Sequence, residues 1–211
     1  MSPARDGLGY RAPGETLHEA GADDAMRVVA GSARGLCLVT PPGDAVRPTT
    51  DRVREALFNS LASLDALRDA VVVDLFAGSG ALGVEALSRG AGYVTFVDAS
   101  ADALRAVRTN LESTRLDPDA AVVRSDALEF LRRSSGTRYD LALVDPPYAF
   151  DGWPDLLAAL DADLVVIESD REIDPGDDAT VLRVRRYGST VVTIARYGDP
   201  DPGRHTPEDR S

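Results

Sequence analysis

The stretch AVVVDLFAGSGALGVEALSRG, residues 70–90, decides the fold. It starts with a continuous apolar run, passes through the glycine pattern Gly78-x-Gly80-x-x-Gly83, and continues as a helical pattern that stops at Gly90. A short apolar run of this kind predicts a strand buried on both faces. The glycines permit a tight turn from strand to helix. Taken alone, the turn has two interpretations. It is either a purely structural connection or a site where the glycines let a ligand approach the backbone closely.

The alternation of strand and helix continues downstream. Further strands are expected over 93–99, 120–127, 139–147 and 162–169, with helical patterns between them, and 179–197 predicts an antiparallel hairpin that turns near Gly188. Apolar strands separated by helices indicate an α/β fold of Rossmann-like type, with a mainly parallel seven-stranded sheet covered on both sides. A small hairpin over 26–43, followed by a helix that Thr49 or Thr50 caps, is expected before the sheet.

Composition narrows the possible functions. No apolar run approaches the roughly 20 residues that cross a bilayer, and the polar N-terminus lacks a secretion signal, so a cytoplasmic monomer without membrane contact is expected. The only cysteine, Cys37, excludes an internal disulfide and a thiolate metal cluster, and we expect it to be buried. No metal is expected. The two histidines lie near the ends, which argues against histidine-based catalysis.

Charge is distributed unevenly along the chain. The net charge is −12, and all 23 basic residues are arginine. Such an acidic balance opposes loose, nonspecific binding of nucleic acid. Residues 26–54, however, carry five arginines against two acids, a local excess of three positive charges.

Three acids stand close to strand ends. Asp74 precedes the glycine turn, and its carboxylate is expected to face the crevice at the strand ends. Asp98 ends the second strand and Asp126 ends the third. An acid at the end of the second strand typically chelates ribose hydroxyls. A dinucleotide pyrophosphate disfavours nearby carboxylates, whereas S-adenosylmethionine lacks phosphate and carries a sulfonium and an ammonium. We therefore predict S-adenosylmethionine as cofactor. The expected cofactor-binding residues are Asp74, Phe76, Ala77, Gly78, Ser79, Gly80, Asp98, Ala99, Asp126 and Ala127.

The fourth strand ends in Asp145-Pro146-Pro147-Tyr148. Two consecutive prolines stop a strand's hydrogen bonding, and a rigid turn is one interpretation of them. The other is catalytic: the Asp145 carboxylate and the Pro146 carbonyl accept both hydrogens of an amino group, and Tyr148 stacks on a base. Alignment and electrostatics then supply most of the catalysis. The four residues are the predicted catalytic motif.

This series of motifs resembles that of class I methyltransferases. With AGSARG (30–35), RPTTDRVREALFNSL (47–61) and DLFAGSGALGVEALSRGA (74–91), the chain closely resembles the RsmD family from about Met26 to about Tyr197. The resemblance implies methylation of the 2-amino group of a guanine in 16S ribosomal RNA, as naked RNA or as the 30S subunit.

The resemblance also implies an RNA-facing segment. Guanidinium groups and hydroxyls at a helix N-terminus suit phosphate oxygens, although a solvated helix face with an Arg52–Glu55 pair would produce the same pattern. The predicted RNA-binding residues are Arg34, Arg47, Thr49, Thr50, Arg52 and Arg54. The predicted domains are a disordered extension (1–25), the hairpin and arginine-rich helix (26–65), the methyltransferase domain (66–197) and a disordered tail (198–211).

Three alternatives remain open at this stage. A DNA adenine methyltransferase could use the same tetrapeptide, but it needs a substantial module to read bases, and the chain has no spare segment of that length. A nicotinamide-dependent oxidoreductase would leave the Asp145 motif unexplained. A non-catalytic ribosome-assembly factor could bind RNA through the hairpin and the arginine helix.

Overall fold

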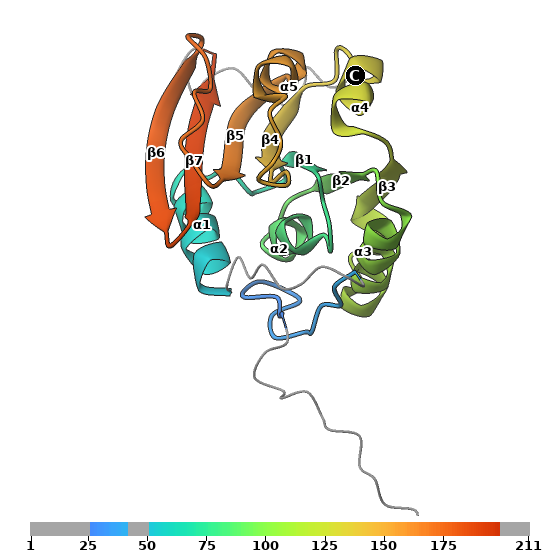
Figure 1. Cartoon of the computed structure of the whole chain (residues 1–211). Coiled ribbons are helices and arrows are strands. Elements are labelled where there is room, and N and C mark those ends of the chain that lie inside the picture. Colours follow the sequence, from blue (N-terminus) through green and yellow to red (C-terminus); the bar gives the residue numbers. More distant parts are fainter. Residues whose placement is uncertain (1–25, 42–50, 199–211) are drawn as a thin grey trace, which may run out of the picture.

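Seven strands form one sheet in the order β3-β2-β1-β4-β5-β7-β6 (Figure 1). The computed structural model describes residues 26–41 and 51–198. The strands are β1 (Val71–Leu75), β2 (Tyr93–Asp98), β3 (Ala120–Arg124), β4 (Tyr139–Val144), β5 (Ala162–Ser169), β6 (Ala179–Tyr187) and β7 (Thr190–Tyr197). The helices are α1 (Asp51–Ser63), α2 (Ala81–Ser88), α3 (Ala101–Thr114), α4 (Ala127–Arg133) and α5 (Trp153–Ala159), with a 3-10 turn, η1 (Asp117–Asp119).

The sheet confirms the mainly parallel topology expected from the sequence. Strands β1 to β5 pair in parallel, whereas β7 runs antiparallel to both β5 and β6. The structure also confirms the antiparallel hairpin over 179–197, with its turn at Gly188, where φ is 60°. Order and direction together are those of a doubly wound sheet that ends in a hairpin.

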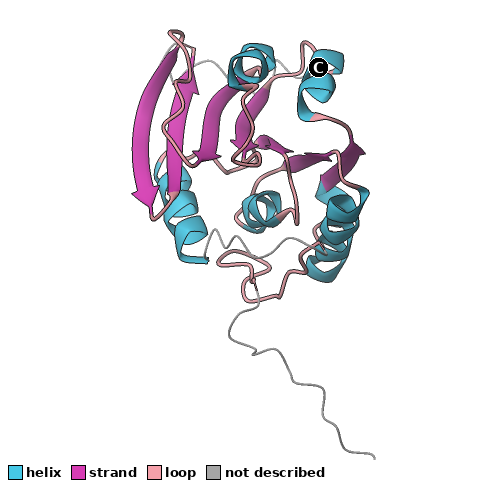
Figure 2. Ribbon diagram, in the orientation of Figure 1, coloured by secondary structure: helices cyan, strands magenta, loops and turns pink. Residues whose placement is uncertain are grey.

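Helices cover both faces of the sheet, as the ribbon view shows (Figure 2). One apolar cluster lies under α1, α2 and α3 and includes Phe58, Leu61 and Phe96. The other lies under α4 and α5 and includes Trp153 and Leu156. Because the central strands contribute to both clusters, their residues are apolar almost without interruption, which is the pattern that the sequence displays.

The segment 26–41 forms a short, irregular hairpin that packs on α2 and α3. Its strand-like pairing is a single antiparallel bridge between Arg27 and Cys37. Glu85 of α2 accepts hydrogen bonds from the backbone N–H groups of Val29 (2.8 Å) and Ala30 (3.1 Å). A side chain of α2 therefore satisfies backbone groups that a partner strand would otherwise pair. The expectation of a buried Cys37 is wrong: the cysteine lies on the surface of the turn.

Some of the predicted features lie outside the described residues: the extension 1–25, the cap of α1 at Thr49 or Thr50, and the tail from 199 onward. In the described ranges no helix combines the length and the apolar character that a membrane span requires. The arginine-rich helix and the sheet share one apolar cluster, so residues 51–63 are packed as part of the same body.

Candidate active site

The strand register brings three loops to one edge of the sheet. Leu75, the last residue of β1, pairs with Val97 of β2 and with Val144, the last residue of β4. The chain leaves these three parallel strands at the same level, so the loops that follow them emerge side by side. This edge, at the carboxyl ends of the strands, is where open α/β sheets bind ligands.

The glycine turn after β1 follows a backbone path that other residues rarely adopt. Gly78 and Gly80 have φ angles of 55° and 77°. A Cβ on Gly80 would lie 3.1 Å from Val107 Cγ2 and 3.2 Å from Phe96 Cε1, so Gly80 allows the turn to pack on the helix and strand behind it. A Cβ on Gly78 would meet no described atom closer than 3.9 Å. Gly78 therefore leaves space in front of the turn, where a cofactor can approach the backbone.

Asp74 lies beneath the turn rather than in the predicted crevice. Its side chain is buried, and Oδ2 accepts a hydrogen bond from Gly83 N at 3.0 Å. Burial raises the pKa of Asp74 to about 8, the hydrogen bond from Gly83 opposes that shift, and the negative charge of Asp98 adds to it. A Cβ on Gly83 would come within 2.9 Å of the same oxygen and 2.2 Å of Phe96 Cε1. Asp74 thus holds the first turn of α2.

Asp98 links the end of β2 to the glycine turn. Its Oδ2 accepts a hydrogen bond from Gly78 N at 2.9 Å, and its Oδ1 accepts one from Ser100 N at 2.7 Å. A carboxylate has about four lone-pair sites, so each oxygen retains capacity for a ribose hydroxyl. Ala99, which follows Asp98, is exposed. The position and remaining acceptor capacity of Asp98 fit the predicted role.

Asp126 caps α4 at the end of the third strand. Its Oδ1 accepts a hydrogen bond from Glu129 N at 3.0 Å, and the residue itself is exposed. Ala127 is buried directly after it. Capping fixes the direction of the Asp126 side chain at the same sheet edge as Asp98. Phe76, Ala77 and Ser79 are half-buried around the glycine turn.

The predicted catalytic motif, residues 145–148, follows β4 directly. Asp145 is half-buried, Pro146 is buried and Pro147 is exposed. Phe150 N donates a 2.8 Å hydrogen bond to the Pro147 carbonyl, which closes a tight turn. Tyr148 is half-buried, and its hydroxyl lies 3.0 Å from Thr190 Oγ1 at the start of β7.

Aromatic contacts tie this motif to the glycine turn. The ring of Phe150 makes edge contacts with Phe76, at 5.2 Å between centroids, and with Trp153, at 5.3 Å. Phe76 has a φ of 60°, which directs the chain into the turn while its ring meets the loop after β4. The sequence alone did not point to Phe150 or Thr190. The available signal for Phe150 was that it is an aromatic residue only two positions after Tyr148.

The structure divides the predicted RNA-binding residues. Arg34 and Arg52 are exposed, as phosphate contacts require. Arg47, Thr49 and Thr50 lie outside the described residues. Arg54 is buried at 1% exposure, which is incompatible with a surface contact to RNA in this conformation.

Arg54 instead fastens the N-terminal segment to the core. Its guanidinium pairs with Asp51 at 2.9 Å and with Glu85 at 3.7 Å, and it donates a hydrogen bond to the Arg27 carbonyl. Arg89 pairs with the same Glu85 at 2.6 Å. Burial lowers the pKa of Arg54, and the carboxylates of Asp51 and Glu85 oppose that effect. Glu85 was not predicted as an ion-pair partner from the sequence, although it is an acid within the apolar helix α2.

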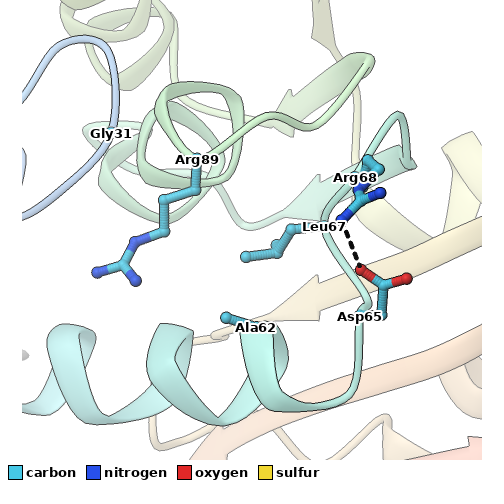
Figure 3. Close-up of a pocket in the computed structure, with 6 residues that line it drawn as sticks. All are labelled: Gly31, Ala62, Asp65, Leu67, Arg68 and Arg89. Atoms are coloured by element: carbon cyan, nitrogen blue, oxygen red, sulfur yellow. Dashed lines mark ion pairs between the residues drawn. The ribbon is translucent and has the colours of Figure 1, made fainter.

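A pocket of about 400 Å³ lies where α1 and α2 end (Figure 3). Asp65 and Arg68 form an ion pair there at 3.8 Å, and the Arg89 guanidinium points away from them. The ends of these helices lead into β1 and β2, at the edge where the parallel strands begin. The pocket is therefore separate from the predicted site. Its lining residues are Gly31, Ala62, Asp65, Leu67, Arg68 and Arg89.

Strand order, the closing antiparallel hairpin and the loops at the carboxyl edge define a class I methyltransferase fold. Solved structures agree: yhhF from Escherichia coli matches with a TM-score of 0.73 at 34% identity, over 82% of this chain and 98% of that one. A protein of Thermus thermophilus matches with a TM-score of 0.70 at 32% identity, over 80% and 98% of the two chains.

The family follows from the sequence. The family described as Conserved hypothetical protein 95 matches residues 26–196, and the chain belongs to this family, which is the RsmD family. The chain is 38% identical to the Bacillus subtilis protein YlbH over 80% of its own length and 97% of that protein. It is 43% identical to ribosomal RNA small subunit methyltransferase D of Escherichia coli over 58% of its own length, and it spans 60% of that enzyme.

Proposed function

We propose that this protein transfers a methyl group from S-adenosylmethionine to the exocyclic 2-amino group of a guanine in small-subunit ribosomal RNA. The observation that carries the proposal is the pairing of Leu75 with Val144. It aligns the glycine turn, where a cofactor can approach Gly78, with Asp145 of the catalytic motif. The small-subunit RNA substrate is supported by the name of the Escherichia coli relative, ribosomal RNA small subunit methyltransferase D.

The residues around the turn fit S-adenosylmethionine. The space in front of Gly78 admits close backbone contact, and Asp98 sits at the strand end where ribose hydroxyls are chelated. When bound, S-adenosylmethionine supplies an electrophilic methyl group. A dinucleotide would bring the negative charge of its pyrophosphate close to the carboxylates of Asp98 and Asp126. S-adenosylmethionine carries no phosphate, which supports it as the cofactor.

Asp145 and Pro146 provide the chemistry at the acceptor. The amino group of guanine is a weak nucleophile because its lone pair is delocalised into the ring. Hydrogen bonds to the Asp145 carboxylate and the Pro146 carbonyl favour a pyramidal nitrogen whose lone pair is available. As the new N–C bond forms, the bond between the methyl carbon and the cofactor sulfur breaks, and S-adenosylhomocysteine is the leaving group. The amino nitrogen becomes cationic and releases one proton, which the Asp145 carboxylate accepts. Tyr148 offers a ring face on which the base stacks.

The proposal is tested with methyl-labelled S-adenosylmethionine, incubated with naked 16S RNA and, separately, with 30S subunits. The modified nucleotide is then mapped and its nucleoside analysed by mass spectrometry. We expect label on the 2-amino group of one guanine in at least one of the two substrates. Label on adenine, transfer to DNA instead of RNA, or binding of NADH without affinity for S-adenosylmethionine would contradict the proposal.

A further inference from the structure

Strand β6 forms one edge of the sheet and carries a concentration of positive charge. Residues 179–197 contain four arginines and no acid, within a chain whose net charge is −12. Arg185 and Arg186 are exposed. Among the described residues, neither forms an ion pair with a carboxylate, whereas Arg133 and Arg138 on other surfaces do. We refer to Arg185 and Arg186 as the β6 arginine pair.

The β6 arginine pair lies toward the end of the sheet at which the parallel strands finish, which is also where the catalytic motif lies. Val191 at the start of β7 pairs with Ser169, the last residue of β5, so the turn between β6 and β7 lies where the parallel strands end. The hydrogen bond between Tyr148 and Thr190 joins this turn to the catalytic motif. Arg186 pairs with Val191 across the hairpin, and the next pair along the two strands contains Thr190.

Helix α1 extends this surface. Arg183 Nη1 donates a 2.5 Å hydrogen bond to Ser60 Oγ, which fixes β6 against the helix. Figure 1 shows the end of β6 beside the end of α1 at which the helix begins. Arg52, in the first turn of α1, is exposed. The helix that the sequence assigned to RNA and the end of β6 therefore adjoin.

The two arginines point to opposite faces of the strand. Arg185 is opposite Val192, whose side chain belongs to the apolar cluster under α1, and Arg186 is opposite Val191. Successive side chains of a strand alternate between faces. The guanidinium groups therefore flank the open edge of β6 from both sides, an arrangement suited to a chain of phosphates that passes along the edge.

We propose that the β6 arginine pair binds the phosphate backbone of the RNA substrate and holds the strand that carries the target guanine beside Asp145. This inference rests on the proposed function and extends it to a surface outside the N-terminal helix. An acidic protein repels RNA over most of its surface, so a local basic edge next to the catalytic loop both attracts the substrate and orients it. Phosphate contacts of this kind position a nucleic acid without reading its sequence.

The test compares the double substitution Arg185→Ala/Arg186→Ala with a matched control, Arg132→Ala/Arg133→Ala, in the full chain. The control also removes two exposed adjacent arginines, but from the last turn of α4, a helix that packs on α5 and β2 rather than on β6. The salt dependence of affinity for naked 16S RNA, methyl transfer to the same RNA and calorimetric binding of S-adenosylmethionine are measured for each. A third variant, Arg185→Lys/Arg186→Lys, retains the charge.

The alanine pair in β6 is expected to weaken RNA binding about tenfold near 0.1 M salt and to flatten the salt slope by about 0.7–0.9 per lost contact. Cofactor affinity stays unchanged, the lysine variant recovers most of the slope, and the α4 control behaves as wild type. If the wild type methylates the RNA and both alanine variants equal the wild type in RNA affinity and in salt slope, the role of the β6 arginine pair is overturned. The proposed function would then still stand. Wild type that neither binds nor methylates the RNA would overturn the proposed function as well. A dimer that the β6 substitution dissociates, with RNA affinity unchanged, would assign the pair to self-association and overturn the inference.

Discussion

Leu75 and Val144 are partners at the ends of two adjacent parallel strands, β1 and β4. Their pairing places the glycine turn next to Asp145, although the two segments are about seventy residues apart in sequence. The edge contact between Phe76 and Phe150 holds the two loops together beyond the strands. The proposed cofactor and acceptor sites therefore lie on two paired strands, an arrangement that suits catalysis by positioning.

Cofactor binding is expected to depend on the open space at Gly78. Gly78→Val fills it and should abolish binding of S-adenosylmethionine measured by calorimetry. Its positive φ also strains a branched side chain by about 1–3 kcal/mol. Gly136→Val is the matched control, because Gly136 has a φ of 90° and no described atom near its missing Cβ. The control should lose similar stability but bind the cofactor; equal binding by both variants would contradict the assignment of the pocket.

The two arginines of α1 are expected to behave differently. Arg54→Ala removes a buried partner of Asp51 and Glu85 and should lower the free energy of unfolding by about 3 kcal/mol, the lower end for breaking a buried pair, because Arg89 still neutralises Glu85. Arg52→Ala, at an exposed position, should change stability by less than about 0.5 kcal/mol and weaken RNA binding. Denaturant titration checks the first effect and salt-dependent RNA binding the second. Equal stability loss in both would refute the division.

The raised pKa of Asp74 predicts a dependence of stability on pH. The folded-state pKa is about 8, above the ordinary value of 3.8, so between these values the folded state keeps a proton that the unfolded state has lost. Its contribution to stability is complete below about pH 4 and is lost as pH rises toward about 8. Asp74→Asn keeps an acceptor for Gly83 N and does not titrate. Its unfolding free energy should fall less than that of wild type between about pH 5 and pH 8; parallel profiles would contradict the shift.

The hydroxyl of Tyr148 is expected to serve structure more than chemistry. Tyr148→Phe removes the contact with Thr190 and should cost about 0.5–1.5 kcal/mol of stability, while methyl transfer stays close to normal because the ring face remains. Thr190→Val should cost a similar amount, and the two losses should not add in the double variant. Tyr148→Ala should slow methyl transfer through lost stacking. A large rate loss in Tyr148→Phe would instead give the hydroxyl a role in the reaction.

Most of the fold could be predicted because it depends on local patterns. Apolar strands alternating with helices specify a covered parallel sheet, and the structure brings the glycine turn and the Asp145 motif to one edge of that sheet. Burial within the site was harder to predict. The sequence suggests a place in the crevice for Asp74, but the neighbouring strand residues are buried on both sides of it, and only the close packing of Gly83 shows that the carboxylate is covered.

The burial of Arg54 could have been predicted from helix periodicity. Arg54 precedes Leu57, Phe58 and Leu61 by three, four and seven residues, which places it on the buried face of α1, whereas Arg52 projects elsewhere. The resemblance to the RsmD family, together with the affinity of guanidinium groups for phosphate, assigned both arginines to RNA. The acid that receives Arg54, Glu85, lies on another helix, and no local pattern predicts such a partner. The exposed position of Cys37 likewise results from packing of the segment 26–41 on α2, which single-chain periodicity does not reveal.

The central claim is that the Asp145 carboxylate orients the amino group during methyl transfer. The most direct test is single-turnover methyl transfer to the RNA substrate by Asp145→Ala, with S-adenosylmethionine affinity measured on the same sample. We predict a rate loss of about 10²–10³-fold, the range for removing one preorganised electrostatic partner, with cofactor affinity retained, and partial activity in Asp145→Asn, which keeps an acceptor oxygen. Methyl transfer by Asp145→Ala at close to the wild-type rate would contradict the mechanism.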